Sequence, residues 1–487
     1  MTMKRHIGLW EDERNEQKAV SELVIEGNHI EFYRRGNYSP FHQTFICSDS
    51  DHKYKVFTHG MCDYGKHRTL DSVCSHKVLY VLQQNCDFQQ GFDINGINSA
   101  SFIIPELIGW LGFRTVEQIY TADCKLAVVE NKKSEIVLKE SNPKIEILFE
   151  TRNAIFDTGF DDRTTGVITN QPRIQITYDQ AGDIHKLCND INSVMQFFSL
   201  MIGYVSNVCD IRLDIEGQSL KSWLYVNRDF SYNMRAIWAT EKMRTAYNNF
   251  QDLLNLYFEN WYDFCNDDIY EFIRRMYFES NRNKDYFAED IIVQYTKILE
   301  GYHLRVTGDE TKANEFRDAL KSVEKEIKSL IFNDKGKSLF TAVLNESVPD
   351  WKYNSSHAGD ISAWIAKGFL SRTGLAQRLE RLDSDYYCVI AKNSKYIQGL
   401  SREQDDEFNI YRRIVDTRNY YSHYKADING VLNYNQICSA INTLKALILM
   451  ILYTKMGMAD NDARRIVSED SELQIQTACL RETEDVE

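Results

Sequence analysis

Near its C-terminus the chain reads Ile414-Val415-Asp416-Thr417-Arg418-Asn419-Tyr420-Tyr421-Ser422-His423-Tyr424. This run ends a segment, 405–424, in which hydrophobic residues recur at helical spacing. A polar stripe follows the same helix at steps of four, three and four residues: Arg412, Asp416, Asn419 and His423. A short loop at 425–430 and a long apolar segment at 432–456 come next. These segments predict that the C-terminal part of the chain is helical.

Arg418 and His423 are the residue types that RNA cleavage requires. RNA breaks when its 2′-hydroxyl attacks the adjacent phosphate, so a protein needs only to move protons and stabilise the added negative charge. A histidine can exchange protons near neutral pH, and an arginine offers a permanently charged fork that matches phosphate oxygens. Asn419 could position either group, and three side chains offer rings for stacking with unpaired bases: Tyr420, Tyr421 and Tyr424. Arg412, on the same polar stripe, is a further candidate for binding the substrate. The run therefore predicts a metal-independent ribonuclease site.

The spacing alone also allows a structural interpretation. Five positions separate Arg418 from His423, which is about 140° around an ideal helix. Arg418 could instead pair with Asp416 or a neighbour, His423 could cap the helix, and the tyrosines could pack in the core. Context must decide between the two.

The N-terminal half has the period of strands. Segments 24–26 and 30–33 flank Gly27-Asn28, segments 136–138 and 145–149 flank a turn at 141–143, and residues 173–178 alternate. One amphipathic helix follows at 185–204, and further strands are expected at 208–215 and 223–227. This pattern predicts a β-rich domain, either a sandwich or a strongly curved sheet, with one or two helices.

After about residue 239 the period becomes helical. Helices are predicted at 241–264, 269–279, 286–306, 313–332, 361–381, 405–424 and 432–456. We therefore expect an α+β multidomain protein: a β-rich sensing or regulatory domain at 1–238, an α-helical ribonuclease domain at 239–465, and an acidic tail at 466–487. The boundary near 239 rests on the change of period alone.

Composition limits where the protein acts and how it binds RNA. No apolar N-terminal stretch indicates secretion, and the apolar run 446–453 is shorter than the roughly 20 residues that span a bilayer. Eleven scattered cysteines without a C-x-x-C motif favour a reducing compartment, so we expect a cytoplasmic protein. The net charge of −14 argues against a broad basic surface, so any RNA site must be local.

The best candidate for a metal site is Cys62, His67, Cys74 and His76. Thiolates and imidazoles are zinc's preferred ligands, but this spacing fits no common zinc finger. Structural packing is the favoured interpretation, and we expect no cofactor.

The run at 414–424 resembles the R-x4-6-H signature of the HEPN superfamily, and in particular its ApeA-like branch. Segments 298–303 and 375–379 are also similar to this family. Weaker similarity to its β-rich N-terminal domain extends over Gly60, Asp63-Tyr64-Gly65-Lys66, Thr69-Leu70, Cys74 and 196–200. The resemblance covers nearly the whole chain and is most specific in the motif.

This resemblance implies an endoribonuclease of anti-phage defence that acts by abortive infection, with a helical HEPN bundle. Two HEPN domains pair as a homodimer so that both motifs line one composite cleft. Arg418 and His423 match the motif, Asn419 matches its polar second position, and Glu300 is expected to approach the cleft. The expected partners are RNA, with tRNA as the candidate substrate, and a phage-derived trigger sensed by the N-terminal domain, and no membrane is expected. The alternative is a non-catalytic HEPN module that binds RNA, a nucleotide or a protein.

Overall fold

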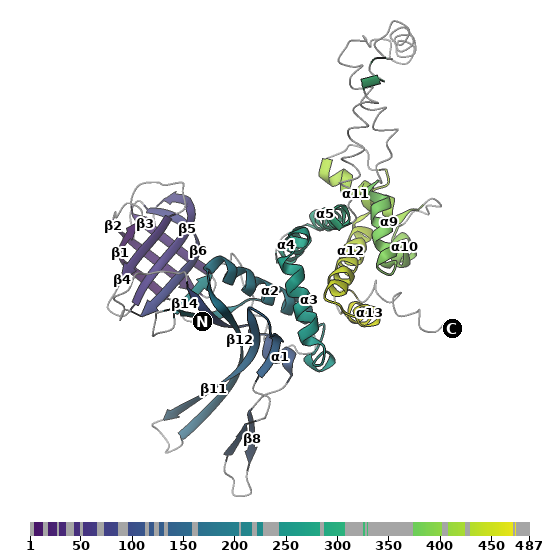
Figure 1. The fold of residues 1–487 in the computed structure, drawn as a ribbon. Coiled ribbons are helices and arrows are strands. Elements are labelled where there is room, and N and C mark those ends of the chain that lie inside the picture. The colour runs from purple at the N-terminus through teal and green to yellow at the C-terminus, as the bar shows by residue number, and fades with distance from the viewer. Residues whose placement is uncertain are drawn as a thin grey trace. The chain divides into compact units, whose positions relative to one another are not determined.

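A computed structural model describes most of the chain in two compact units. The first comprises Met1–Phe264 with Lys455–Met458, and the second comprises Cys265–Thr454 with Ala459–Glu487 (Figure 1). The described residues are 4–12, 18–26, 29–35, 43–48, 52–65, 73–85, 96–112, 116–120, 126–130, 135–157, 164–203, 206–216, 222–226, 243–282, 287–306, 325, 326, 329, 374–401, 408–423, 429–470 and 473. The predicted domain boundary near 239 lies outside them and stays a prediction.

The first unit is built on antiparallel strands. They are β1 (Lys4–Asp12), β2 (Lys18–Glu26), β3 (His29–Arg35), β4 (Gln43–Ser48), β5 (His52–Gly65), β6 (Val73–Asn85), β7 (Ile97–Ile103), β8 (Val116–Tyr120), β9 (Leu126–Glu130), β10 (Glu135–Lys139), β11 (Lys144–Asp157), β12 (Thr164–Gly182), β13 (Cys209–Ile215) and β14 (Ser222–Val226). Twelve of them form one sheet in the order β10-β11-β12-β7-β13-β14-β6-β3-β2-β1-β4-β5, and β8 pairs with β9 separately.

One end of the large sheet closes on itself. Because β5 pairs with β6 as well as with β4, the strands β6-β3-β2-β1-β4-β5 form a closed barrel, which Figure 1 shows in purple. Aromatic side chains fill its interior: Trp10 and Phe32 have ring centroids 5.1 Å apart, and Phe32 and Phe45 have centroids 5.0 Å apart. Closure removes the exposed strand edges that an open sheet would leave at this end.

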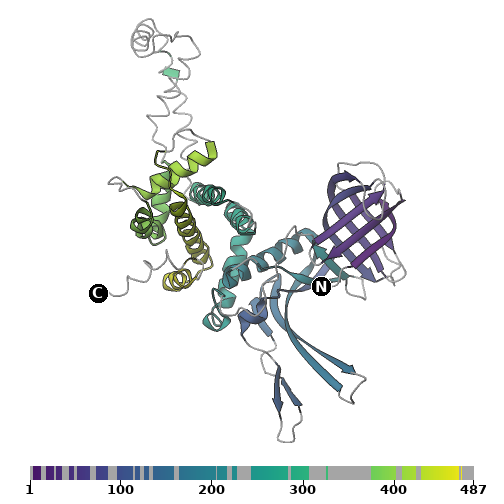
Figure 2. The ribbon, with the colours of Figure 1, turned by 180° about the vertical axis from the view of Figure 1, so that it is seen from behind.

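The other end of the sheet is open and curved, and β11 and β12 extend from it as a long ribbon (Figure 2). Helix α2 (Ile184–Ile202) follows β12 directly and begins at Asp183, whose carboxylate accepts the backbone N–H of Lys186 at 2.8 Å. Its Asp190 carboxylate accepts the hydroxyl of Tyr178 on β12 at 2.7 Å and that of Tyr262 on α3 (Leu254–Asn266) at 2.6 Å. The short helix α1 (Leu107–Leu111) completes this part.

The second unit is helical. Its helices are α4 (Asp268–Arg282), α5 (Ala288–Val306), α9 (Leu375–Asp385), α10 (Val389–Gly399), α11 (Ile410–His423), α12 (Tyr434–Lys455) and α13 (Asp460–Glu469). Helix α12 supplies the apolar core, with every residue from Ala446 to Tyr453 buried. It is the one helix of the described part long and apolar enough to cross a membrane, but 72% of its apolar window is buried, as in a core helix.

These observations confirm the predicted fold class, and the curved sheet is the alternative that the structure shows. The β2–β3 hairpin pairs Glu26 with His29 across the predicted turn.

The prediction of one helix over 241–264 was wrong, because residues 247–253 form the short η2 (Tyr247–Asn249) and turns before α3 begins. Buried Thr245 explains the irregular backbone: its hydroxyl donates to the Met201 carbonyl at 2.6 Å and accepts the Trp110 indole at 2.9 Å. The predicted helix at 313–332 lies almost wholly outside the described residues.

Candidate functional site

Three helices of the second unit, α5, α9 and α11, pack against one another and bring three charged side chains together. The Oε1 atom of Glu300 on α5 lies 3.5 Å from Nη1 of Arg378 on α9. Its Oε2 atom lies 3.5 Å from Nη2 of Arg418 on α11. We call Glu300, Arg378 and Arg418 the arginine array. One carboxylate therefore serves two guanidinium groups.

The guanidinium of Arg418 is held on two sides. Besides the ion pair with Glu300, its Nη1 donates to the side-chain carbonyl of Asn419 at 2.9 Å. Its Nε is buried and donates to no described residue. The side chain as a whole is 19% exposed, so the group is ordered and still reachable from solvent.

Thr417 fixes the end of α11 that carries Arg418. This residue is fully buried, and its hydroxyl donates to the Arg413 carbonyl at 2.7 Å and accepts the backbone N–H of Leu432 at 2.9 Å. The second bond joins the helix to the chain segment that leads into α12. The backbone of α11 is thereby tied in place one residue before Arg418.

A buried carboxylate, Asp383, links α9, α10 and α11. Asp383 accepts the backbone N–H groups of Ile390 at 2.7 Å and Ala391 at 2.9 Å, and the hydroxyl of Tyr411 at 2.7 Å. Burial raises the pKa of Asp383 although these donors favour its charged form. Because two of its partners open α10, Asp383 caps that helix from the preceding one.

His423 is the last residue of α11 and is exposed. Its imidazole makes no hydrogen bond or ion pair with any residue that the structure describes. His423 is therefore not part of the array that contains Arg418. This agrees with the separation of the two residues by about 140° on an ideal helix. Within the described part of one chain, the two motif residues stand apart.

Three further predicted site residues, Tyr420, Tyr421 and Arg412, are described by the structure and do not belong to the array. The rings of Tyr420 and Tyr421 pack edge to face with centroids 4.9 Å apart, and burial, assisted by Glu289, raises the pKa of the Tyr421 phenol. Arg412 is 81% exposed and lies 3.8 Å from Asp416, outside the array. Tyr424 lies outside the described residues.

Two features of this region were missed in the sequence. Arg378 lies in a segment that resembles the family, yet no role was predicted for it, because only the fold brings it to Glu300. Asp383 had no local signal either, since its partners lie on other helices.

Three residues of the zinc candidate lie on two neighbouring strands. Cys62 lies on β5, Cys74 and His76 lie on β6, and the two strands pair. The side chains of these residues, and His67 altogether, lie outside the described part of the molecule. Within that part, no group of three His, Cys, Asp or Glu residues could hold a metal ion.

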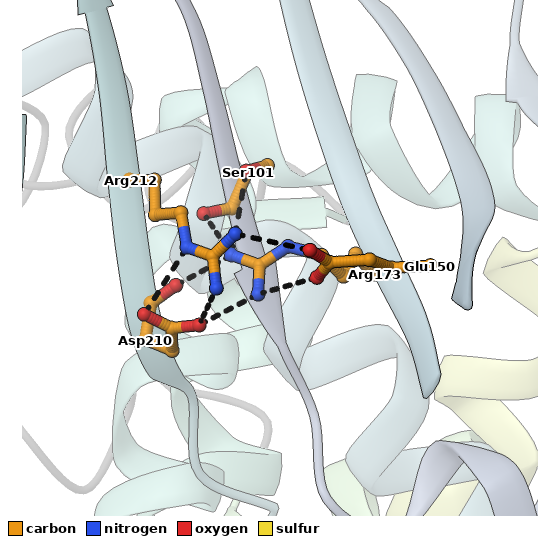
Figure 3. A network of polar contacts seen from close by, with 5 residues as sticks. All are labelled: Ser101, Glu150, Arg173, Asp210 and Arg212. Carbon is orange, nitrogen blue, oxygen red and sulfur yellow. Dashed lines mark hydrogen bonds and ion pairs between the residues drawn. The ribbon is translucent and has the colours of Figure 1, made fainter. Parts of the chain in front are cut away.

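A second arginine cluster lies on the open part of the sheet in the first unit (Figure 3). Asp210 on β13 accepts Arg173 of β12 at 2.7 Å and Arg212 at 2.6 Å, and Glu150 of β11 lies 3.3 Å from Arg212. Burial opposes ionisation of Asp210, but the hydrogen bonds from both arginines hold its pKa below the usual value. The charges of the two arginines and the two carboxylates balance. We therefore interpret this cluster as a structural link between β11, β12 and β13.

The fold and the site together define a protein with a β-rich unit and a helical unit whose Arg-Asn-x3-His run ends a helix, as in HEPN proteins. The chain belongs to the ApeA-like HEPN family: residues 5–261 match ApeA N-terminal domain 1 and residues 293–462 match Apea-like HEPN. The predicted resemblance is confirmed, and it places the chain among HEPN proteins of anti-phage defence, whose HEPN domains are generally nucleases. No curated protein and no solved structure shows significant similarity to it.

Proposed function

We propose that this protein is a metal-independent endoribonuclease that protects cells from phage by cutting RNA. The observation that carries the proposal is the state of Arg418. Its guanidinium is ordered by Glu300 and Asn419, is partly exposed, and shares its carboxylate partner with a second arginine. Such a group is suited to binding a phosphate.

The reaction needs no metal ion from outside. The 2′-hydroxyl of the RNA loses its proton and attacks the phosphorus, while the bond from phosphorus to the 5′-oxygen breaks and that oxygen gains a proton. A 2′,3′-cyclic phosphate and a 5′-hydroxyl result. Arg418 stabilises the negative charge on the phosphate oxygens, and histidine moves the protons.

A homodimer through the HEPN domain would complete the site. Because Arg418 and His423 leave the same helix in different directions, the histidine of one copy can serve beside the arginine of the other.

The substrate class follows from the size and chemistry of the site. One arginine array and the adjacent pair Tyr420 and Tyr421 suit an unpaired stretch of RNA, such as a tRNA loop, because side chains can stack on bases that are not paired. The β-rich unit would sense a phage-derived trigger and restrain cleavage until it binds.

Purified protein tests the proposal directly. It should cut RNA in the presence of a chelator and leave cyclic phosphate ends, and a substrate with a single 2′-deoxyribose at the cut site should resist cleavage there. Arg418→Ala and His423→Ala should each abolish cutting, whereas Arg465→Ala, an exposed arginine of α13 that pairs with Asp462 on its own helix, should not. Phage protection that survives both motif substitutions would instead identify a non-catalytic HEPN module.

A further inference from the structure

We infer that Arg378 is a positioning residue that keeps Glu300 from neutralising Arg418. The inference rests on the proposed function, since it concerns how the same site attracts RNA phosphate. It assigns a task to the array residue that does not belong to the R-x4-H motif.

The geometry gives each arginine one oxygen of the shared carboxylate. Oε1 of Glu300 faces Arg378 and Oε2 faces Arg418, each at 3.5 Å. A guanidinium and a carboxylate bind most strongly through two parallel hydrogen bonds that use both oxygens. Arg378 prevents that arrangement at Arg418 because it attracts the other oxygen.

The consequence is an incompletely compensated charge on Arg418. Its second partner is the neutral amide of Asn419, and Glu300 is its one carboxylate partner among the described residues. The side chains of Arg378, Glu300 and Arg418 are 13%, 25% and 19% exposed, so water screens their charges only partly. An approaching phosphate therefore meets a positive group that is oriented but not neutralised.

Glu300 is still required, because two arginines without a shared carboxylate would repel each other and lose their orientation. The array thus balances two needs. Glu300 holds Arg418 in place, and Arg378 limits how strongly it does so.

Substitutions in the full-length protein separate these roles. In Arg378→Gln, Glu300 is free to turn both oxygens to Arg418. KM for RNA should therefore rise by about tenfold, which is the usual size of the coupling between two residues in contact, and kcat should change less. With Glu300→Gln, kcat should fall because Arg418 loses its orientation, while RNA binding stays as tight or becomes tighter. The double variant should bind RNA as well as Glu300→Gln does, because no carboxylate remains to be restrained.

The binding step is measured separately with a 2′-O-methyl RNA that cannot be cut, by fluorescence anisotropy. Arg378→Lys should restore most of the affinity lost in Arg378→Gln, and Arg381→Gln, an exposed arginine on the same helix, should leave it unchanged. Thermal unfolding of each variant shows whether it folds.

The outcomes are distinct. If the double variant binds RNA as weakly as Arg378→Gln, then Arg378 contacts phosphate itself or supports the fold, and the inference is wrong. If wild type binds the uncut RNA with the expected pattern but cleaves nothing, the proposed function fails and the inference stands. A wild-type protein that neither binds nor cuts RNA overturns both.

Discussion

The carboxylate of Glu300 lies 3.5 Å from the guanidinium of Arg418, although 118 positions of sequence separate the two residues. Helix α5 supplies one and helix α11 the other, so the contact depends on how these two helices pack. Any substitution that shifts α5 should therefore alter the site without touching it.

Gly301 offers the first prediction, because it directly follows Glu300. A methyl group there would collide with the ring of Phe272 on α4. We expect Gly301→Ala to lower the free energy of unfolding by about 1–3 kcal/mol and to reduce RNA cleavage. Denaturant unfolding and a cleavage assay measure both. Adding Phe272→Leu should recover part of each loss, and Gly399→Ala, where a methyl group meets open space, serves as the control.

A mixed dimer provides the second prediction. Arg418→Ala and His423→Ala subunits, coexpressed with different tags and purified as the heterodimer, retain one intact arginine and one intact histidine on opposite chains. If each site takes its arginine from one copy and its histidine from the other, the purified heterodimer keeps one complete site of two and should regain up to about half of wild-type cleavage. A heterodimer as inactive as either parent would show that one chain must supply both residues.

The third prediction concerns the hydroxyl of Thr417. Thr417→Val keeps the shape of the side chain but leaves the buried N–H of Leu432 without its acceptor, so stability should fall by about 1–3 kcal/mol. Thr443→Val on α12 is the matched control, because this buried threonine donates to Ser439 at 2.9 Å and accepts nothing from the described residues. Equal losses in the two variants would argue against a role for the Leu432 bond.

The fourth prediction is a pH dependence from Asp210 in the first unit. A carboxyl whose pKa is lowered in the folded state stabilises it above the unfolded pKa, and this stabilisation is lost as pH falls through the folded value. Wild type should therefore exceed Asp210→Asn in melting temperature above about pH 4, and the difference should shrink at lower pH. Asparagine suits this position because the backbone φ is 49°, a left-handed conformation that it tolerates.

The same scan from pH 3 to 7 includes Asp214→Asn, an exposed carboxyl on the same strand, as the control. A difference between wild type and Asp210→Asn that does not change with pH would mean that the two arginines do not hold the charge of Asp210.

Local pattern was enough to predict most elements. The paired strands around Gly27-Asn28, the helix after β12, and the helices α5, α11 and α12 all have periods that tertiary contacts reinforce. The closed barrel was not predictable, because the pairings of β1 with β4 and β5 with β6 depend on partners that a strand's own sequence does not specify.

Helix α10 shows why other elements were missed. It begins after Tyr387 and Cys388, both in left-handed conformations with φ of 71° and 55°, and its capping carboxylate comes from Asp383 on the preceding helix. No Ser, Thr, Asp or Asn stands at its start to indicate a helix. The array is a similar case: the motif pointed to Arg418, but only the packing of three helices reveals Arg378.

The wide spacing of the array along the chain has a consequence for how the protein is made. A ribosome releases residues in order, and Glu300, Arg378 and Arg418 emerge far apart in time. A growing chain that has not yet passed residue 418 lacks part of the array, and helix α12, which packs the core of this unit, comes later still. If the proposed ribonuclease activity needs the complete array, the growing chain would be inert during its own translation, beside the messenger and transfer RNAs that it would otherwise meet first.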